Sequence, residues 1–103
     1  MKRGEVRWYT FSAPDKRRPV LLLSRDSILP YLNEVTVAPL TTTIRDIPTE
    51  VILTPSDGVP ERCAVNCDHI QTVAQAKTGK LITTLTTSQM EEVSRAISFA
   101  LAL

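Results

Sequence analysis

The feature with the clearest chemical meaning is an arginine at the start of a buried strand. Arg18 and Pro19 open the run RPVLLLS at positions 18–24, which has the continuous apolar character of a fully buried strand. A guanidinium stays protonated, and its planar fork matches the oxygens of a phosphate. A solvated arginine just before the core is the commoner meaning of this pattern, so a phosphate site needs support from neighbouring residues.

Basic side chains and hydroxyls near this strand provide that support. Lys16 and Arg17 precede Arg18 and form a short basic cluster, although such clusters are often solvated loops. Thr41 begins a run of threonines at the end of another predicted strand, where a hydroxyl can face a site. From spacing alone, a turn-forming hydroxyl is the better reading of Thr41.

Other kinds of catalytic site are poorly supported. His69 is the single histidine, and Asp68 precedes it. Neighbours on a strand face opposite sides, so Asp68 cannot easily orient His69 in a Ser-His-Asp arrangement. The acidic residues show no metal-ligand spacing, and one histidine is too few for most catalytic metal sites. We therefore expect no metal and no cofactor.

Metal-free phosphoryl chemistry remains open to such a chain. RNA carries its own nucleophile in the 2′-hydroxyl, so an enzyme that cleaves it needs a base, an acid and donors for the charged phosphorane. Arginine and threonine side chains can be those donors. The residue types at positions 18 and 41 fit that requirement.

Short strands are the elements that must position these residues. Alternating or continuous apolar patterns, bounded by turn residues, predict five or six strands. They are Glu5–Phe11, Arg18–Ser24, Glu34–Leu40, Thr49–Thr54, Ala64–Val73 as one strand or a pair, and a short Leu81–Leu85. Ser12–Arg17 is expected to be a turn.

The C-terminal segment has the clearest helical signal. Thr86 and Gln89 have the spacing of a capping box, and Leu85 and Met90 occupy the hydrophobic staple positions. One apolar stripe is expected to follow: Met90, Val93, Ile97, Ala100 and Leu101. The fold class is therefore mainly β, a small and strongly bent antiparallel barrel with a C-terminal helix over its open face.

Bulk properties are those of a single soluble domain, residues 1–103. Hydrophobic residues make up 43% and charged residues 22% of the chain, and the net charge is only +1, which argues against a sequence-blind nucleic-acid binder. No apolar run approaches the ~20 residues of a membrane span, and no signal peptide is expected at the N-terminus. Cys63 and Cys67 are expected to be free thiols. These features favour a cytoplasmic protein.

Six segments, in order, resemble signatures of the MazF/PemK toxin family. They are Lys2–Val6 (KRGEV), Arg17–Leu21 (RRPVL), Thr36–Thr41 (TVAPLT), Ile47–Val51 (IPTEV), Asn66–Thr72 (NCDHIQT) and the helix Met90–Leu101. Each motif alone is weak, but their order and spacing extend over nearly the whole chain.

The resemblance implies a dimeric toxin with an SH3-like barrel of the CcdB/PemK type. It would be a metal-independent, sequence-selective endoribonuclease, controlled by a cognate MazE-like antitoxin, that cleaves RNA by 2′-hydroxyl attack. The family's central active-site residues map onto Arg18 and Thr41, and the acidic residue that some members use maps onto Asp68. We expect substrate contacts from Lys16, Arg17, Thr42, Thr43, Asn66 and His69.

Two positions depart from the family's pattern. The first turn, Ser12–Arg17, is shorter than in many members, and Asn66 stands where some members have an arginine. The general base is therefore open between Asp68, favoured by the resemblance, and His69, whose unperturbed pKa lies nearest neutrality.

Two other functions fit the same scaffold, because fold alone does not decide function. The first is a CcdB-like toxin that inhibits DNA gyrase by protein–protein binding. That group depends on a C-terminal Trp-Gly-Ile tail, whereas this chain ends Ala100-Leu101-Ala102-Leu103. The second is a catalytically inactive binding module.

Overall fold

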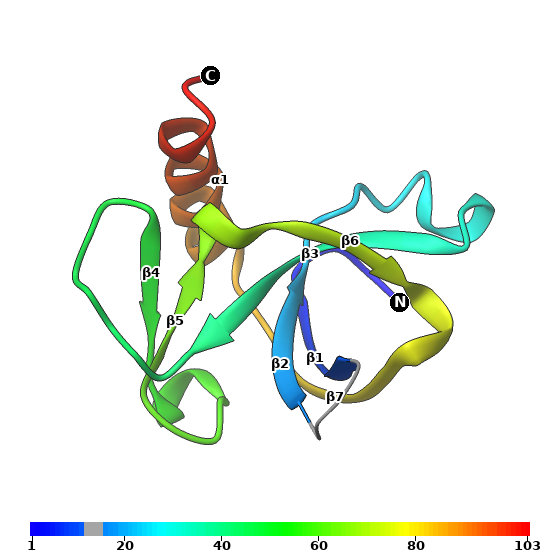
Figure 1. Ribbon diagram of the computed structural model, residues 1–103, viewed down its shortest axis with the longest axis horizontal. Helices are drawn as coiled ribbons and strands as arrows, with labels where there is room; N and C mark the ends of the chain where they lie inside the picture. Colours follow the sequence, from blue (N-terminus) through cyan, green and yellow to red (C-terminus); the bar gives the residue numbers. More distant parts are fainter. Residues whose placement is uncertain (12–15) are drawn as a thin grey trace.

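In the computed structural model, which describes residues 1–11 and 16–103 (Lys16 by its backbone alone), seven strands and one α-helix make up the fold (Figure 1). The strands are β1 Glu5–Phe11, β2 Lys16–Leu22, β3 Glu34–Thr41, β4 Glu50–Leu53, β5 Cys63–Asn66, β6 Gln71–Ala74 and β7 Thr78–Thr84. The helix α1 is Thr87–Ala100, and short 3₁₀ turns lie at η1 Leu29–Tyr31, η2 Pro55–Asp57, η3 Cys67–His69 and η4 Gln75–Lys77. No helix in the described ranges has the length and apolar character needed to cross a membrane.

All strand pairs are antiparallel, in the order β4-β5-β3-β2-β1-β7, with β6 added beside β3. β3 is the central strand, because its first half pairs with β6 and β2 and its end pairs with β5. The predicted fold class, a mainly antiparallel sheet with a C-terminal helix, is confirmed. The sheet curls strongly (Figure 1) without closing, since no pairing between the outer strands β4 and β7 occurs in the described structure.

Several observed strand boundaries differ from the predicted ones. Lys16 and Arg17 belong to β2 rather than to the preceding turn, because the β1–β2 pairing continues to Phe11 and Lys16; the rest of that predicted turn, 12–15, lies outside the described residues. For the segment 64–73, predicted as one strand or a pair, the pair is confirmed, with η3 between the two strands. There the Asn66 side chain accepts a hydrogen bond from the Asp68 N–H at 3.1 Å and ends β5. The last strand, β7, is also longer than predicted, starting at Thr78.

Strand β2 is apolar on both sides because the sheet carries a core on each face. Leu21 belongs to the cluster that packs under α1, together with Val93, whereas Val20 and Leu22 belong to a second cluster on the other face. All four side chains are fully buried. This explains the continuous apolar run of the sequence, and it gives Arg18 a rigid strand to project from.

The helix begins as predicted and ends earlier than its predicted stripe. The Thr86 hydroxyl accepts from the Gln89 N–H at 3.1 Å, and the Gln89 side chain accepts from the Thr86 N–H at 2.8 Å, so the capping box is confirmed. Val93 and Ala96 are the buried helix residues. Leu101 lies past the end of α1 and is 50% exposed, so its place in the stripe was wrong, and Ala96 was missed.

The two cysteines are buried free thiols, as predicted. Burial, and then the negative charge of Asp68, raise the pKa of the Cys67 thiol to about 11. Burial also raises the pKa of Cys63, and the carboxylates of Glu61 and Asp57 add to this effect. Both thiols therefore stay protonated near neutral pH.

Candidate active site

A pocket forms where β3 leaves β2 and joins β5. The β2–β3 pairing extends to Val20 and Pro39, and the next residues of β3, Leu40 and Thr41, pair with β5 instead. Pro39 has no N–H with which to continue the ladder. The start of β2, which carries Arg18, therefore separates from the end of β3, which carries Thr41.

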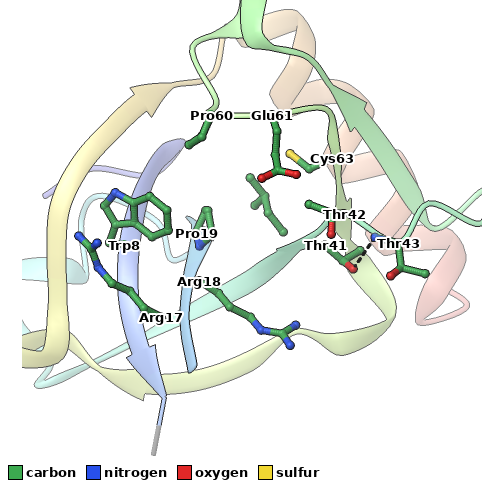
Figure 2. A pocket seen from close by; sticks show the side chains of 11 residues that line it. Trp8, Arg17, Arg18, Pro19, Thr41, Thr42, Thr43, Pro60, Glu61 and Cys63 are labelled. Atoms are coloured by element: carbon green, nitrogen blue, oxygen red, sulfur yellow. Dashed lines mark hydrogen bonds between the residues drawn. The ribbon is translucent and has the colours of Figure 1, made fainter. Parts of the chain in front are cut away.

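The resulting pocket has a volume of about 420 Å³, within the range of small-ligand sites. Figure 2 shows its lining side chains, which come from β1, β2, the end of β3, the loop before β5 and the start of β5. They are Trp8, Arg17, Arg18, Pro19, Leu40, Thr41, Thr42, Thr43, Pro60, Glu61 and Cys63. The structure thus brings together five of the residues that sequence reasoning assigned to the site, namely Arg17, Arg18, Thr41, Thr42 and Thr43.

The two arginines of β2 diverge in the pocket (Figure 2). Arg17 lies over the ring of Trp8, with its guanidinium carbon 4.4 Å from the ring centroid, a cation–π distance. Arg18 extends the other way, towards the end of β3. Alternation along a strand explains the divergence, because successive side chains leave on opposite sides. Of these two arginines, only Arg18 has a guanidinium that does not stack on the Trp8 ring.

The hydroxyl of Thr41 is oriented by its own turn. Thr41 Oγ1 accepts a hydrogen bond from the Thr43 N–H at 3.1 Å (the dashed line of Figure 2). This contact occupies a lone pair of the oxygen and leaves its proton free to donate. The turn-forming role and the donor role proposed for Thr41 are therefore compatible.

Three other predicted residues lie elsewhere. Asp68 and His69 are on η3, and Asn66 precedes them at the far end of β5 from Cys63, roughly 10 Å along an extended strand. None of the three lines the pocket. Asp68 Oδ2 accepts from the hydroxyl of buried Thr49 at 2.6 Å, and His69 Nδ1 is 3.2 Å from Asn66 Nδ2. They form a hydrogen-bonded group beside α1, which η3 contacts.

Sequence reasoning missed Trp8 and Glu61. Trp8 lies within the predicted strand Glu5–Phe11, and Glu61 lies between the predicted strands Thr49–Thr54 and Ala64–Val73. No local pattern marks either residue, because β1–β2 pairing brings Trp8 to Arg17, and the course of the chain after η2 brings Glu61 to the end of β3. The predicted contact from Lys16 concerns a side chain outside the described residues.

No ion pair between described residues neutralises the charges of the pocket. Among the side chains that the structure describes, the one salt bridge joins Arg7 and Glu5 at 2.9 Å, away from the pocket. For Glu5, burial acts to raise the pKa, but the hydrogen bond and charge of Arg7 and the Lys2 backbone outweigh it, and the pKa is lowered. Because no described carboxylate forms an ion pair with Arg18, its guanidinium remains available for an anion such as a phosphate.

No group of three or more His, Cys, Asp or Glu side chains that could hold a metal ion occurs in the described part of the chain. The pocket instead offers a guanidinium, a hydroxyl donor and a carboxylate around an open space. Such donors can bind a phosphodiester and stabilise the extra negative charge that develops on its oxygens during attack.

Comparison with known proteins agrees with this picture. The family described as PemK-like, MazF-like toxin of type II toxin-antitoxin system matches residues 2–101. The probable endoribonuclease MazF5 of Mycobacterium tuberculosis is 42% identical over 99 residues, covering 95% of this chain and 90% of that protein.

Two solved structures have the same fold over almost the whole chain. The Mycobacterium tuberculosis toxin MazF-mt6 has a TM-score of 0.88 and 37% identity, over 96% of this chain and 97% of that one. A mycobacterial endoribonuclease in complex with its cognate antitoxin has a TM-score of 0.87 and 29% identity, over 100% of this chain and 96% of that one. With the family match and the pocket between β2 and β3, these likenesses show that the chain belongs to the PemK/MazF family of type II toxins.

Proposed function

We propose that this protein is a toxin endoribonuclease that cleaves RNA without a metal ion, by attack of the 2′-hydroxyl on the neighbouring phosphate. The products are a 2′,3′-cyclic phosphate and a 5′-hydroxyl end. The observation that carries the proposal is the meeting of Arg18 and Thr41 in one pocket, on a chain whose relatives are endoribonucleases. The gyrase-binding alternative is not favoured, because the family and the relatives are of the MazF type.

The two donors have different tasks in this mechanism. The Arg18 fork binds the non-bridging oxygens of the scissile phosphate and stabilises their charge in the phosphorane. The Thr41 hydroxyl, held by the Thr43 N–H, donates to a second oxygen. Because both groups project from strands, they are in place before substrate arrives, which limits the reorganisation that the reaction requires.

Residues around these donors bind the rest of the RNA. Arg17, stacked on Trp8, presents charge and an aromatic face beside the pocket, and both suit single-stranded RNA. Thr42 and Thr43 lie on the same wall, and Lys16 adds charge from β2. Asn66 and His69 lie near the other end of β5, so they contact RNA only if the RNA chain runs along β5. The role of Asp68 as catalytic acid or base stays a prediction.

Cleavage in the presence of a chelator tests the proposal directly. A defined single-stranded RNA, incubated with purified protein in EDTA, is expected to be cut to fragments with cyclic-phosphate and 5′-hydroxyl ends, because the nucleophile belongs to the RNA. Mass spectrometry of the fragments identifies these ends. Activity that needs added magnesium, or fragments with 5′-phosphate ends, would contradict the mechanism.

We also propose that the protein forms a two-fold dimer in the cytoplasm and is inhibited by a cognate antitoxin. Large apolar side chains remain exposed, including Tyr31 at 81% and Phe99 at 65%, and a dimer would cover such surface. An acidic disordered segment of the antitoxin would bind along the pocket, where Arg17 and Arg18 are unpaired with any described carboxylate.

Sedimentation and competition test these partners. Sedimentation velocity at micromolar concentration is expected to give a dimer, and a monomer would contradict the proposal. Purified antitoxin is expected to displace a labelled RNA from the toxin, less strongly as salt is raised, because charge pairs at an exposed site are screened. A ternary complex that retains the RNA would exclude occlusion of the pocket.

A further inference from the structure

The proposed reaction needs a group that takes the proton of the 2′-hydroxyl, and the pocket contains one that sequence reasoning did not assign. Of the described side chains that line the pocket, Glu61 is the one carboxylate. Figure 2 shows it entering from the loop before β5, across the pocket from Arg18 and beside the threonines at the end of β3. We propose that Glu61 is the general base of this endoribonuclease, an inference that rests on the proposed function.

The other pocket side chains are unsuited to this role. Arginine cannot lose its proton near neutral pH, and a threonine hydroxyl is a far weaker base than a carboxylate. Burial raises the pKa of the Cys63 thiol, so its basic thiolate form is scarce at neutral pH. Asp68 and His69 are at the other end of β5, hydrogen-bonded to Thr49 and Asn66.

The charge of Glu61 acts on a pocket residue and has no ion-pair partner among the described side chains. Its carboxylate contributes to the raised pKa of Cys63, a pocket residue, and no described cation lies within ion-pair distance of it. Among the described residues that line the pocket, the other charged or titratable groups are Arg17 and Arg18 on β2 and Cys63 on β5. Asp57 also raises the pKa of Cys63. From β1 and β3 the pocket receives only uncharged side chains.

The segment before Glu61 is held firmly, which a base requires. Asp57 Oδ2 accepts from the Thr54 N–H at 2.8 Å, and its Oδ1 accepts from Gln89 Nε2 of α1 at 2.9 Å. The Thr83 hydroxyl of β7 donates to the Asp57 carbonyl at 2.9 Å. Gly58 then turns the chain at a φ of +97°, where a Cβ would lie 2.5 Å from Thr83 Oγ1.

The step balances without any added reagent. The 2′-oxygen forms a bond to phosphorus as its proton passes to a carboxylate oxygen of Glu61. The bond between phosphorus and the 5′-oxygen breaks, its electron pair leaves with that oxygen, and the oxygen takes a proton from solvent water. Glu61 then returns its proton to the solvent. Arg18 binds the non-bridging oxygens throughout.

Single-turnover cleavage across acid to neutral pH tests this assignment in the full-length protein. Glu61→Gln is expected to lower the rate by about 10²–10⁴-fold and to remove the part of the profile in which the rate rises with pH, because an amide cannot take the proton. Glu61→Asp should retain part of the cleavage rate and part of the rise of the rate with pH. Anisotropy of a labelled RNA should show undiminished binding to Glu61→Gln. Glu92→Gln, on the exposed face of α1, is the matched control and should behave as wild type.

A substrate with sulfur in place of the scissile 5′-oxygen separates a base from an acid. Sulfur leaves without a proton, so loss of a base slows both substrates equally, whereas loss of an acid slows only the oxygen substrate. We expect Glu61→Gln to slow cleavage of the oxygen substrate and of the sulfur substrate equally. The assignment would be overturned by a defect confined to the oxygen substrate or by a wild-type pH profile for Glu61→Gln. It would also be overturned if Asp68→Asn, instead of Glu61→Gln, lost the part of the profile in which the rate rises with pH. Wild-type protein that fails to cleave RNA in EDTA would refute the proposed function itself.

Discussion

Replacing Arg18 by alanine is expected to lower the rate of RNA cleavage by about 10²–10³-fold, since one donor to the charged phosphorane is lost. The fold should persist, because the Arg18 side chain is exposed at the start of β2 and has no ion-pair partner in the described structure. Single-turnover cleavage in EDTA measures the first effect, and urea unfolding measures the second. The combination separates a catalytic role from a structural one.

Arg18→Lys sharpens the test. Lysine keeps the charge but lacks the planar fork, so it should bind RNA nearly as well as wild type and still lose most of the cleavage rate. Arg95→Ala is the matched control, because Arg95 is exposed on α1 and lies outside the pocket. If Arg18→Ala cleaves RNA at nearly the wild-type rate, Arg18 is not the phosphate donor.

The two β-strands that position Arg18 and Thr41 could be predicted from the sequence. The apolar run after Arg18 reports burial on both faces of β2, and Pro39 marks where β3 leaves its partner. These signals depend on residues close in sequence. They predicted the strands next to Arg18 and Thr41, whereas the assignment of both residues to one site came from the resemblance to the MazF/PemK family.

What could not be predicted depends on pairing and on loop geometry. Trp8 meets Arg17 only through the register of β1 against β2, and Glu61 reaches the pocket only because Gly58 turns the chain. The choice between one strand and a pair over 64–73 stayed open, since no apolar pattern indicates the hydrogen bond from the Asp68 N–H to the Asn66 side chain that ends β5. Asp68, which the resemblance favoured as the base, lies on η3 and does not line the pocket.

Removing the core under the site should have the largest effect on stability. Leu21 is fully buried between β1 and β3, opposite Val6 and Ala38, and packs in the cluster beneath α1. Leu21→Ala is expected to lower the free energy of unfolding by about 2–5 kcal/mol, from lost transfer free energy and the cavity left behind. Against a total of about 5–15 kcal/mol for a domain of this size, this change leaves a marginal fold. Urea unfolding of the purified variant measures the loss.

A matched leucine on the surface shows whether burial is the cause. Leu81 is 42% exposed on the outer strand β7, so Leu81→Ala should cost far less than Leu21→Ala. Leu21→Ala should also cleave RNA at close to the wild-type rate under conditions in which it remains folded, because Arg18 and Thr41 are unchanged. Equal losses of stability in the two variants would contradict the two-sided core. Full stability with lost cleavage would instead show that Leu21 acts on the site by positioning Arg18, since both residues belong to β2.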